Sequence, residues 1–108
     1  MLHDYFLNRI AQITSICQKY KVKKLYAFGS IVDGRFVEGE SDIDLLIELH
    51  PYGKKEENKT LINIWFDFQE ILNCEVDLIT KKSIKGKYFK KYLELYKELV
   101  FEDLNVKD

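Results

Sequence analysis

Hydrophobic residues recur every three or four positions through the first part of the chain, and this spacing lines one face of a helix. The pattern predicts one helix over residues 1–20, with the apolar stripe Leu2, Phe6, Ile10, Ile13 and Ile16. The spacing then gives way to a short apolar run, residues 25–28, which stops at Gly29. Such a run is typical of a buried strand that ends in a turn.

Two further apolar runs follow a glycine-containing segment. Residues 29–41 hold three glycines and few apolar side chains, so we expect a loop there, in which Ser30 could cap a short helix. The apolar runs over residues 43–49 and 75–80 predict a second and a third strand.

Two more helices are predicted from stripes of apolar residues. The first stripe lies between the second and third strands and comprises Leu61, Ile64, Trp65, Phe68, Ile71 and Leu72. The charged residues 54–59 before it are expected to form an exposed connection. The second stripe predicts a last helix that reaches Val100, and it comprises Tyr88, Phe89, Tyr92, Leu95, Tyr96, Leu99 and Val100. This order of helices and strands indicates one α/β domain over residues 1–108.

The composition narrows the class of protein. A chain of 108 residues has room for one hydrophobic core. Its 17 basic and 18 acidic residues are balanced, whereas nucleic-acid binders usually carry a basic excess, so a nucleic-acid partner is not favoured. Cys17 and Cys74 are scattered, which predicts free thiols within helices in a reducing compartment. Neither a membrane span nor a signal peptide is visible, so we expect a cytoplasmic protein.

Asp42 and Asp44 stand at the start of the second strand. Because alternate residues of a strand point to one face, their carboxylates project together while Ile43 and Leu45 face the core. Two carboxylates held this close repel each other unless a positive charge lies between them. Oxygen ligands suit the hard ion Mg²⁺, so the pair predicts a divalent metal site.

Asp77 interrupts the apolar third strand in the same way. If that strand pairs beside the second, its carboxylate completes a three-acid cluster, which can bind two metal ions about 4 Å apart and neutralise a transferring phosphoryl group. The alternative is that each acid meets solvent at a strand end, as we expect for Glu48.

Gly29 and Ser30 directly follow the first strand. A glycine lets the backbone approach a ligand closely, and the serine adds a hydroxyl and backbone N–H groups that could cradle the phosphates of a triphosphate. A strand followed by Gly-Ser is commonly only a turn. The phosphate interpretation is favoured because Ser41-Asp42-Ile43-Asp44 begins twelve residues after the glycine.

Together these segments resemble the minimal nucleotidyltransferases, or MNT domains, of the DNA polymerase β superfamily. The matching segments span about half of the chain and are Phe28-Gly29-Ser30, Gly34, residues 41–47 and residues 76–79. The resemblance implies the nucleotidyltransferase fold, a small mixed β-sheet of three or more strands flanked by helices. It also implies transfer of a nucleoside monophosphate, with AMP from ATP as the expected case and pyrophosphate leaving.

The resemblance carries roles onto individual residues. Gly29 and Ser30 would contact the triphosphate. Asp42 and Asp44 would ligate Mg²⁺. Asp77 would complete the site as a further metal ligand or as the base for the incoming hydroxyl.

The loop after Ser30 departs from the family pattern. Family members often carry an arginine just before the position of Gly34, where this chain has Asp33, and the loop is one residue longer. Arg35 follows the glycine and could substitute as the nucleotide-binding arginine, or phosphate binding could be weakened.

A partner protein or a homo-oligomer is expected because no second domain that holds the acceptor fits in this length. In the family, minimal domains are commonly paired with a small helical HEPN protein, and as antitoxins they can adenylylate its tyrosine. Tyr88, Tyr92 and Tyr96 on the last predicted helix suit such an interface, although the same stripe also suits packing on the sheet.

Lysines gather late in the chain, at Lys81, Lys82, Lys85, Lys87, Lys90 and Lys91. They could attract a triphosphate or RNA over a long range, or they could form a solvated helix start. His3 and His50 are expected at the surface.

Three hypotheses result. The leading one is an Mg²⁺-dependent nucleotidyltransferase that acts on a partner protein. The second is a module that holds nucleotide in the same pocket and masks its partner without turnover. The third is an RNA-binding accessory that uses the lysines.

Overall fold

A four-stranded mixed β-sheet with the order β3-β2-β1-β4 forms the centre of the computed structural model, which describes residues 1–104. β1 (Val22–Phe28) pairs antiparallel with β2 (Ile43–Leu49) and with β4 (Glu98–Glu102). β2 pairs parallel with β3 (Val76–Thr80). Parallel neighbours need a crossover connection, and helix α4 (Lys54–Leu72) supplies it. The sheet confirms the predicted α/β class and the predicted pairing of the second and third strands.

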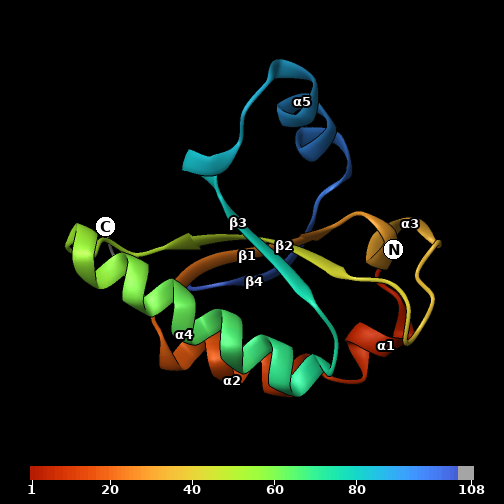
Figure 1. Ribbon diagram of the computed structural model, residues 1–108, viewed down its shortest axis with the longest axis horizontal. Helices are drawn as coiled ribbons and strands as arrows, with labels where there is room; N and C mark the ends of the chain where they lie inside the picture. The colour runs from red at the N-terminus through yellow and green to blue at the C-terminus, as the bar shows by residue number, and fades with distance from the viewer. Residues whose placement is uncertain (105–108) are drawn as a thin grey trace.

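One face of the sheet is covered by α2 (Ile10–Lys19) and α4 (Lys54–Leu72), which lie together beneath it (Figure 1). The hydrophobic core fills the space between these helices and the sheet. The inward residues of β2 belong to this core, as the alternation along that strand predicts. Its fully buried side chains include Phe6, Ile13, Leu25, Ile43, Leu45, Ile47, Ile64 and Phe68.

The opposite face is covered only in part. The chain leaves β3 through a short 3₁₀ helix, η1 (Lys81–Ser83), and enters α5 (Lys87–Tyr96), which stands above the sheet on the side away from α2 and α4 (Figure 1). A small cluster of three buried residues, Phe28, Leu46 and Leu93, joins α5 to the sheet. Much of this face therefore stays open around the start of β2.

The N-terminal helix is divided, contrary to the single helix predicted for residues 1–20. α1 (Asp4–Leu7) and α2 are separated at Asn8 and Arg9. A continuous helix would use the carbonyl of Tyr5 to accept the Arg9 backbone N–H. Here the Arg9 guanidinium donates to that carbonyl at 2.8 Å, and the Arg9 N–H turns to the carbonyl of Phe6.

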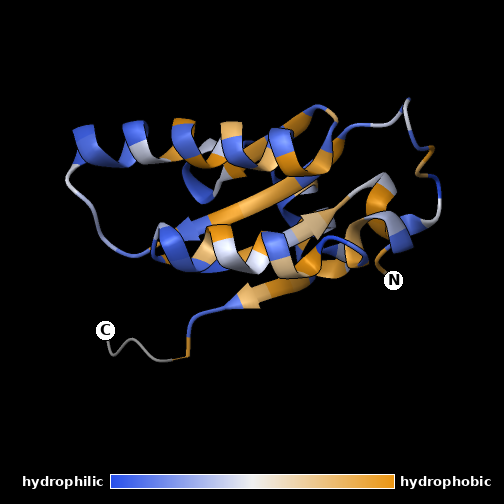
Figure 2. Ribbon diagram, turned by 90° about the horizontal axis from the view of Figure 1, so that it is seen from below, coloured by the Kyte–Doolittle hydropathy of each residue, from blue (hydrophilic) through white to orange (hydrophobic). Residues whose placement is uncertain are grey.

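α4 begins at Lys54, so residues 54–59 are mostly exposed, as predicted, but they form the first turns of a helix and not a connection. The helix starts after Gly53, and Glu56 and Glu57 stand in its first turn, where negative charge favours the helix dipole. Figure 2 shows that the first turns of this long helix are hydrophilic. The first turns of α4 bury few side chains, so they carry no apolar stripe from which the start of the helix could be predicted.

The last predicted helix is also wrong beyond Tyr96. The helix ends there, and residues Glu98–Glu102 form β4 on the free edge of β1, with Ala27 opposite Glu98 and Tyr26 opposite Leu99. This segment satisfies a helical spacing and a strand alternation equally. The unpaired N–H and C=O groups of the β1 edge decide between them.

Two smaller expectations are corrected. His50 is buried, not at the surface, and its Nε2 lies 3.2 Å from Asp103 Oδ2. Both cysteines are free, but only Cys17 lies in a helix, because Cys74 falls between α4 and β3.

Among residues 1–104, no helix combines the length and hydrophobicity needed to cross a bilayer.

Candidate active site

The strand register places two of the predicted acids side by side. Asp44 of β2 lies directly opposite Phe28 of β1 on one side and opposite Asp77 of β3 on the other. Residues in register on neighbouring strands point to the same face, and for Asp44 this is the open face, because Ile43 and Leu45 are buried on the other. Two acids 33 positions apart in the sequence thus become neighbours.

Asp42 precedes β2 and is exposed, and Asp77 is exposed on the outer strand. Asp44 is half-buried between them. Burial, followed by the negative charges of Asp77 and Asp42, raises the pKa of Asp44 to about 6, and the positive charge of Arg35 offsets part of this rise. The three predicted acids therefore form one electrostatic cluster centred on Asp44.

Gly29 makes room for this central carboxylate. Its backbone has a φ of 75° and a ψ of −147°, a conformation that is essentially restricted to glycine. A Cβ atom at this position would overlap Asp44 Oδ2. Two constraints therefore require glycine at this position: the backbone conformation of the turn that ends β1, and the close approach of Asp44.

Ser30 opens the one-turn helix α3 (Ser30–Asp33), which Gly29 caps through its carbonyl. The N–H groups of Val32 and Asp33 donate to that carbonyl at 3.0 and 3.1 Å. A short helix therefore forms inside the predicted loop. Its first residue lies beside the glycine that touches Asp44, which brings Gly29 and Ser30 to the carboxylate cluster.

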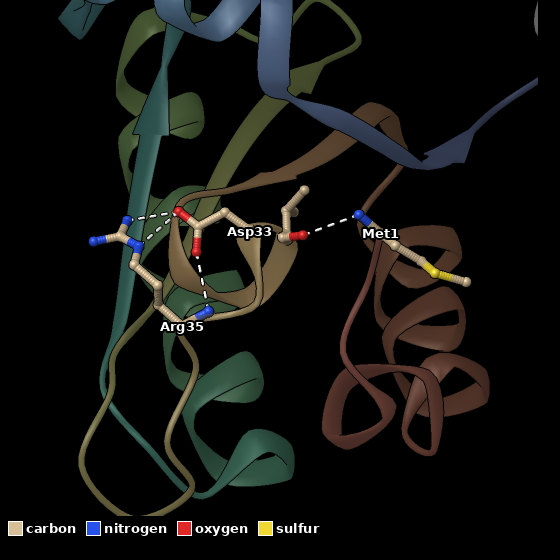
Figure 3. A network of polar contacts seen from close by, with 4 residues as sticks. Met1, Asp33 and Arg35 are labelled. Atoms are coloured by element: carbon tan, nitrogen blue, oxygen red, sulfur yellow. Dashed lines mark hydrogen bonds and ion pairs between the residues drawn. The ribbon is translucent and has the colours of Figure 1, made fainter.

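Arg35 is bound by Asp33, the residue at the position where family members often carry an arginine. Its guanidinium donates two hydrogen bonds to Asp33 Oδ2, at 2.6 and 2.9 Å, and its backbone N–H donates to Asp33 Oδ1 (Figure 3). These hydrogen bonds lower the pKa of Asp33. The charge of Arg35 still acts on Asp44, so the arginine lies on the carboxylate side of the loop.

The donor set fits magnesium without forming a closed metal cage. Among residues 1–104, no group of three or more His, Cys, Asp or Glu side chains is arranged to hold a metal ion by itself. Mg²⁺ commonly binds through one or two carboxylates and completes its shell with water and substrate phosphates. Asp44, flanked by two exposed carboxylates and open to one side, matches that mode.

Aromatic side chains that the sequence analysis assigned only to a packing or partner stripe border the site. The ring of Phe89 meets that of Phe28 edge-on at 5.9 Å and stacks on that of Tyr92 at 6.2 Å. Phe28 is the register neighbour of Asp44. The only sequence signal for this placement was the amphipathic stripe of the last helix.

The lysine cluster divides between two cavities: Lys81 and Lys90 line one, and Lys82 and Lys85 line the other. Lys81 pairs with Glu48 and Lys82 with Glu57, each at 3.3 Å. Lys85 is exposed beyond η1, and the remaining three project from α5. The lysines do not converge on the carboxylates as a group.

Relatives share this chain's sequence over most of its length. The sequence profile of the nucleotidyltransferase domain matches residues 10–100. One protein of Methanocaldococcus jannaschii, whose name provisionally describes a protein adenylyltransferase, is 45% identical over 70% of this chain and 74% of its own length. A second one, with the same description, is 40% identical over 71% of this chain and 74% of its own.

Solved structures share the fold at lower identity. One described as a minimal nucleotidyltransferase is 18% identical, has a TM-score of 0.68 and covers 87% of this chain and 92% of its own. A toxin–antitoxin with AMP-PNP is 18% identical, has a TM-score of 0.67 and covers 88% and 74%. A complex of a tri-AMPylated HEPN toxin of Shewanella oneidensis with its MNT antitoxin is 15% identical, has a TM-score of 0.61 and covers 90% and 72%. With its sheet, its Gly-Ser turn and its acids arranged in this way, the chain belongs to the nucleotidyltransferase domain family and is an enzyme of that kind.

Proposed function

We propose that the protein transfers AMP from ATP to a hydroxyl group of a partner protein. The observation that carries this proposal is the position of Asp44. Its carboxylate lies where a side chain at Gly29 would be, and Asp77 is its register neighbour on β3. A phosphate-binding turn and a carboxylate pair that meet at one point are what phosphoryl transfer requires, since its catalysis consists of positioning and charge neutralisation.

The triphosphate is assigned to the Gly29–Ser30 turn. Gly29 has no side chain to keep phosphates away from the backbone. Ser30, the first residue of α3, adds a hydroxyl next to it. Arg35, although it is bound to Asp33, adds positive charge close enough to act on Asp44. These groups would hold the chain of phosphates against the carboxylates.

Asp44 and Asp42 are assigned as the principal magnesium ligands, with Asp77 beside them. Burial, followed by the negative charges of Asp77 and Asp42, raises the pKa of Asp44, and a divalent cation would relieve the repulsion among these carboxylates. When bound, Mg²⁺ neutralises the phosphate charge that develops in the reaction and orients the phosphates. Two ions are expected if all three acids take part.

The reaction is a displacement at the α-phosphorus of ATP. The acceptor oxygen forms a bond to that phosphorus, the bond to the bridging oxygen of the β-phosphate breaks, and pyrophosphate leaves with the electron pair. The hydroxyl proton passes to a carboxylate, for which we assign Asp77. Asp77 is exposed at the outer strand, where an incoming hydroxyl can reach it.

The acceptor is proposed to be a tyrosine of a HEPN-type helical protein, so that the two proteins form a toxin–antitoxin pair. Two of the related structures are toxin–antitoxin assemblies, one with AMP-PNP and one with an AMPylated HEPN toxin. The open face above Asp44 leaves room for an acceptor to approach.

The test is label transfer from α-labelled ATP to the product of the neighbouring gene, in the presence of Mg²⁺. Asp44→Asn should lower the rate by about 100-fold or more, because a charge that stabilises the transition state is removed. Glu48→Gln is the matched control. It lies on the same face of β2 but pairs with Lys81, so it should transfer label at the wild-type rate.

Other outcomes distinguish the remaining hypotheses. Nucleotide binding and inhibition of the partner without any label transfer would contradict the enzyme and support the module that masks its partner. Retention of RNA that persists in EDTA and is lost in high salt would support the RNA-binding hypothesis.

A further inference from the structure

A continuous row of rings leads from the acidic site to the end of α5. It consists of Phe28, Phe89, Tyr92 and Tyr96, and we call it the aromatic ladder. Phe89 and Tyr92 are nearly parallel, at 12°, and the centroids of Tyr92 and Tyr96 are 5.3 Å apart. Because Phe28 stands opposite Asp44, the ladder begins beside the carboxylates.

The far end of the ladder lines a cavity of about 430 Å³ that reaches the phosphate turn. Gly29 and Val32 form one side of this cavity, and Tyr92, Leu95 and Tyr96 of α5 form the other. Small-molecule sites of this size are usually lined by apolar and aromatic side chains. Gly29, which touches Asp44, therefore also borders a cavity of mixed polar and apolar lining.

The charged groups around this cavity already have partners. Asp33 is bound by Arg35, Glu98 lies 2.6 Å from the Met1 ammonium, and the Lys97 ammonium lies over a tyrosine ring of β1. Ring surfaces and aliphatic groups are left to meet a ligand. Such a lining favours a flat aromatic group over a phosphate or a carboxylate.

We infer that this cavity binds the aromatic base of the nucleoside triphosphate, with Tyr92 and Tyr96 as the stacking residues. The inference rests on the proposed function, which places the triphosphate at Gly29. A nucleotide whose phosphates lie on that turn must direct its base into an adjoining space. The cavity adjoins the turn through Gly29 itself and presents the rings that a base requires.

The test compares two ligands of the full chain by calorimetry: AMP-PNP with Mg²⁺ and tripolyphosphate with Mg²⁺. The two share a chain of phosphates, but only the first carries a base. Stacking on aromatic side chains is worth about tenfold or more in affinity per base. Wild-type protein should therefore bind AMP-PNP at least about tenfold more tightly than tripolyphosphate.

Tyr96→Ala is the principal variant, since Tyr96 is 59% exposed and its removal should leave the fold intact. Tyr92→Leu is the second, because leucine retains an apolar contact with Phe89. Both should erase most of the preference for AMP-PNP and leave the affinity for tripolyphosphate unchanged. Tyr88→Ala is the control. It lies on the same helix, is 81% exposed and is not part of the cavity lining, so it should bind both ligands as the wild type does.

The results separate this inference from the proposed function. Equal affinity of the wild type for both ligands, or an unchanged preference in both tyrosine variants, would overturn the base subsite and leave the phosphate site standing. If the two variants lose label transfer to the partner but keep the preference for AMP-PNP, the cavity serves the acceptor and the inference is wrong. Failure to bind either ligand would overturn both proposals.

Discussion

Gly29 and Asp44 share one small space at the end of β1. The glycine has a positive φ, and Asp44 Oδ2 occupies the position that a side chain there would take. The Gly29 turn and the central carboxylate are thus in direct steric contact. A side chain added at Gly29 should therefore displace the Asp44 carboxylate.

Gly29→Ala should lower the free energy of unfolding by about 2–4 kcal/mol, from backbone strain and from the displaced Asp44 together. Gly34→Ala is the matched control, because Gly34 also has a positive φ but nothing lies within 4 Å of its added Cβ. It should cost only the backbone part, about 1–2 kcal/mol. Denaturant unfolding of both variants provides the measurement.

A double mutant tests the contact itself. In an Asp44→Ala background the overlapping oxygen is absent, so Gly29→Ala should cost less than it does in the wild type and retain only its own backbone strain. A cost that is the same in both backgrounds would show that the two residues do not share this space.

At the scale of elements, α5 is the least anchored part of the molecule. Leu93 is the residue of α5 that is buried, and it packs with Phe28 and Leu46 on the open face. Several large residues of this helix are exposed, among them Tyr88, Leu95 and Tyr96. The helix can therefore present a surface to a ligand or a partner, at the expense of its own stability.

Leu93→Ala should destabilise α5 more than the rest of the chain. Large-to-small changes at buried positions cost about 2–5 kcal/mol, and α5 has little else to hold it. Hydrogen exchange should show lost protection in α5, while β1 and β2 keep theirs. Leu95→Ala, at a position that is 64% exposed on the same helix, should change exchange little. Uniform loss of protection across the sheet after Leu93→Ala would contradict independent anchoring.

At the scale of the whole molecule, the acidic cluster is assembled from distant parts of the chain. α4 carries the chain across one face of the sheet and returns it so that β3 lies parallel to β2. The α2–α4 layer covers that face and α5 stands on the opposite side (Figure 1), where Asp42 is exposed and Asp44 is half-buried. The fold thus gathers like charges where solvent only partly screens them.

This gathering should make stability depend on pH. The pKa of Asp44 rises from 3.8 to about 6 in the folded protein. Well below pH 3.8 the group is protonated in both states. As pH rises from 4 to 6 the unfolded state ionises first, so the folded state loses about 1–2 kcal/mol, allowing for the water around this half-exposed group.

The measurement is denaturant unfolding in EDTA between pH 4 and pH 8. Asp44→Asn should lack this loss, and its stability relative to wild type should increase with pH until about pH 7. Glu38→Gln removes an exposed carboxylate from the loop and should follow the wild-type profile. A constant difference between wild type and Asp44→Asn at all pH values would contradict the raised pKa.

The sequence by itself determined the features that arise from neighbours along the chain. Alternation along β2 placed Asp44 on one face and Ile43 and Leu45 on the other. The end of an apolar run at Gly29 located the turn that ends β1. These inferences hold because strand geometry fixes the direction of each side chain locally.

Only the tertiary structure decided the features that depend on an available neighbour. Residues 98–102 became a strand because the edge of β1 offered hydrogen bonds, although their spacing also fits a helix. Tyr92 came to lie beside Gly29 because α5 folds back over the sheet. The local sequence pattern predicts which face of a helix or strand is apolar. The packing of the whole chain decides which neighbour that face, or the edge of a strand, contacts.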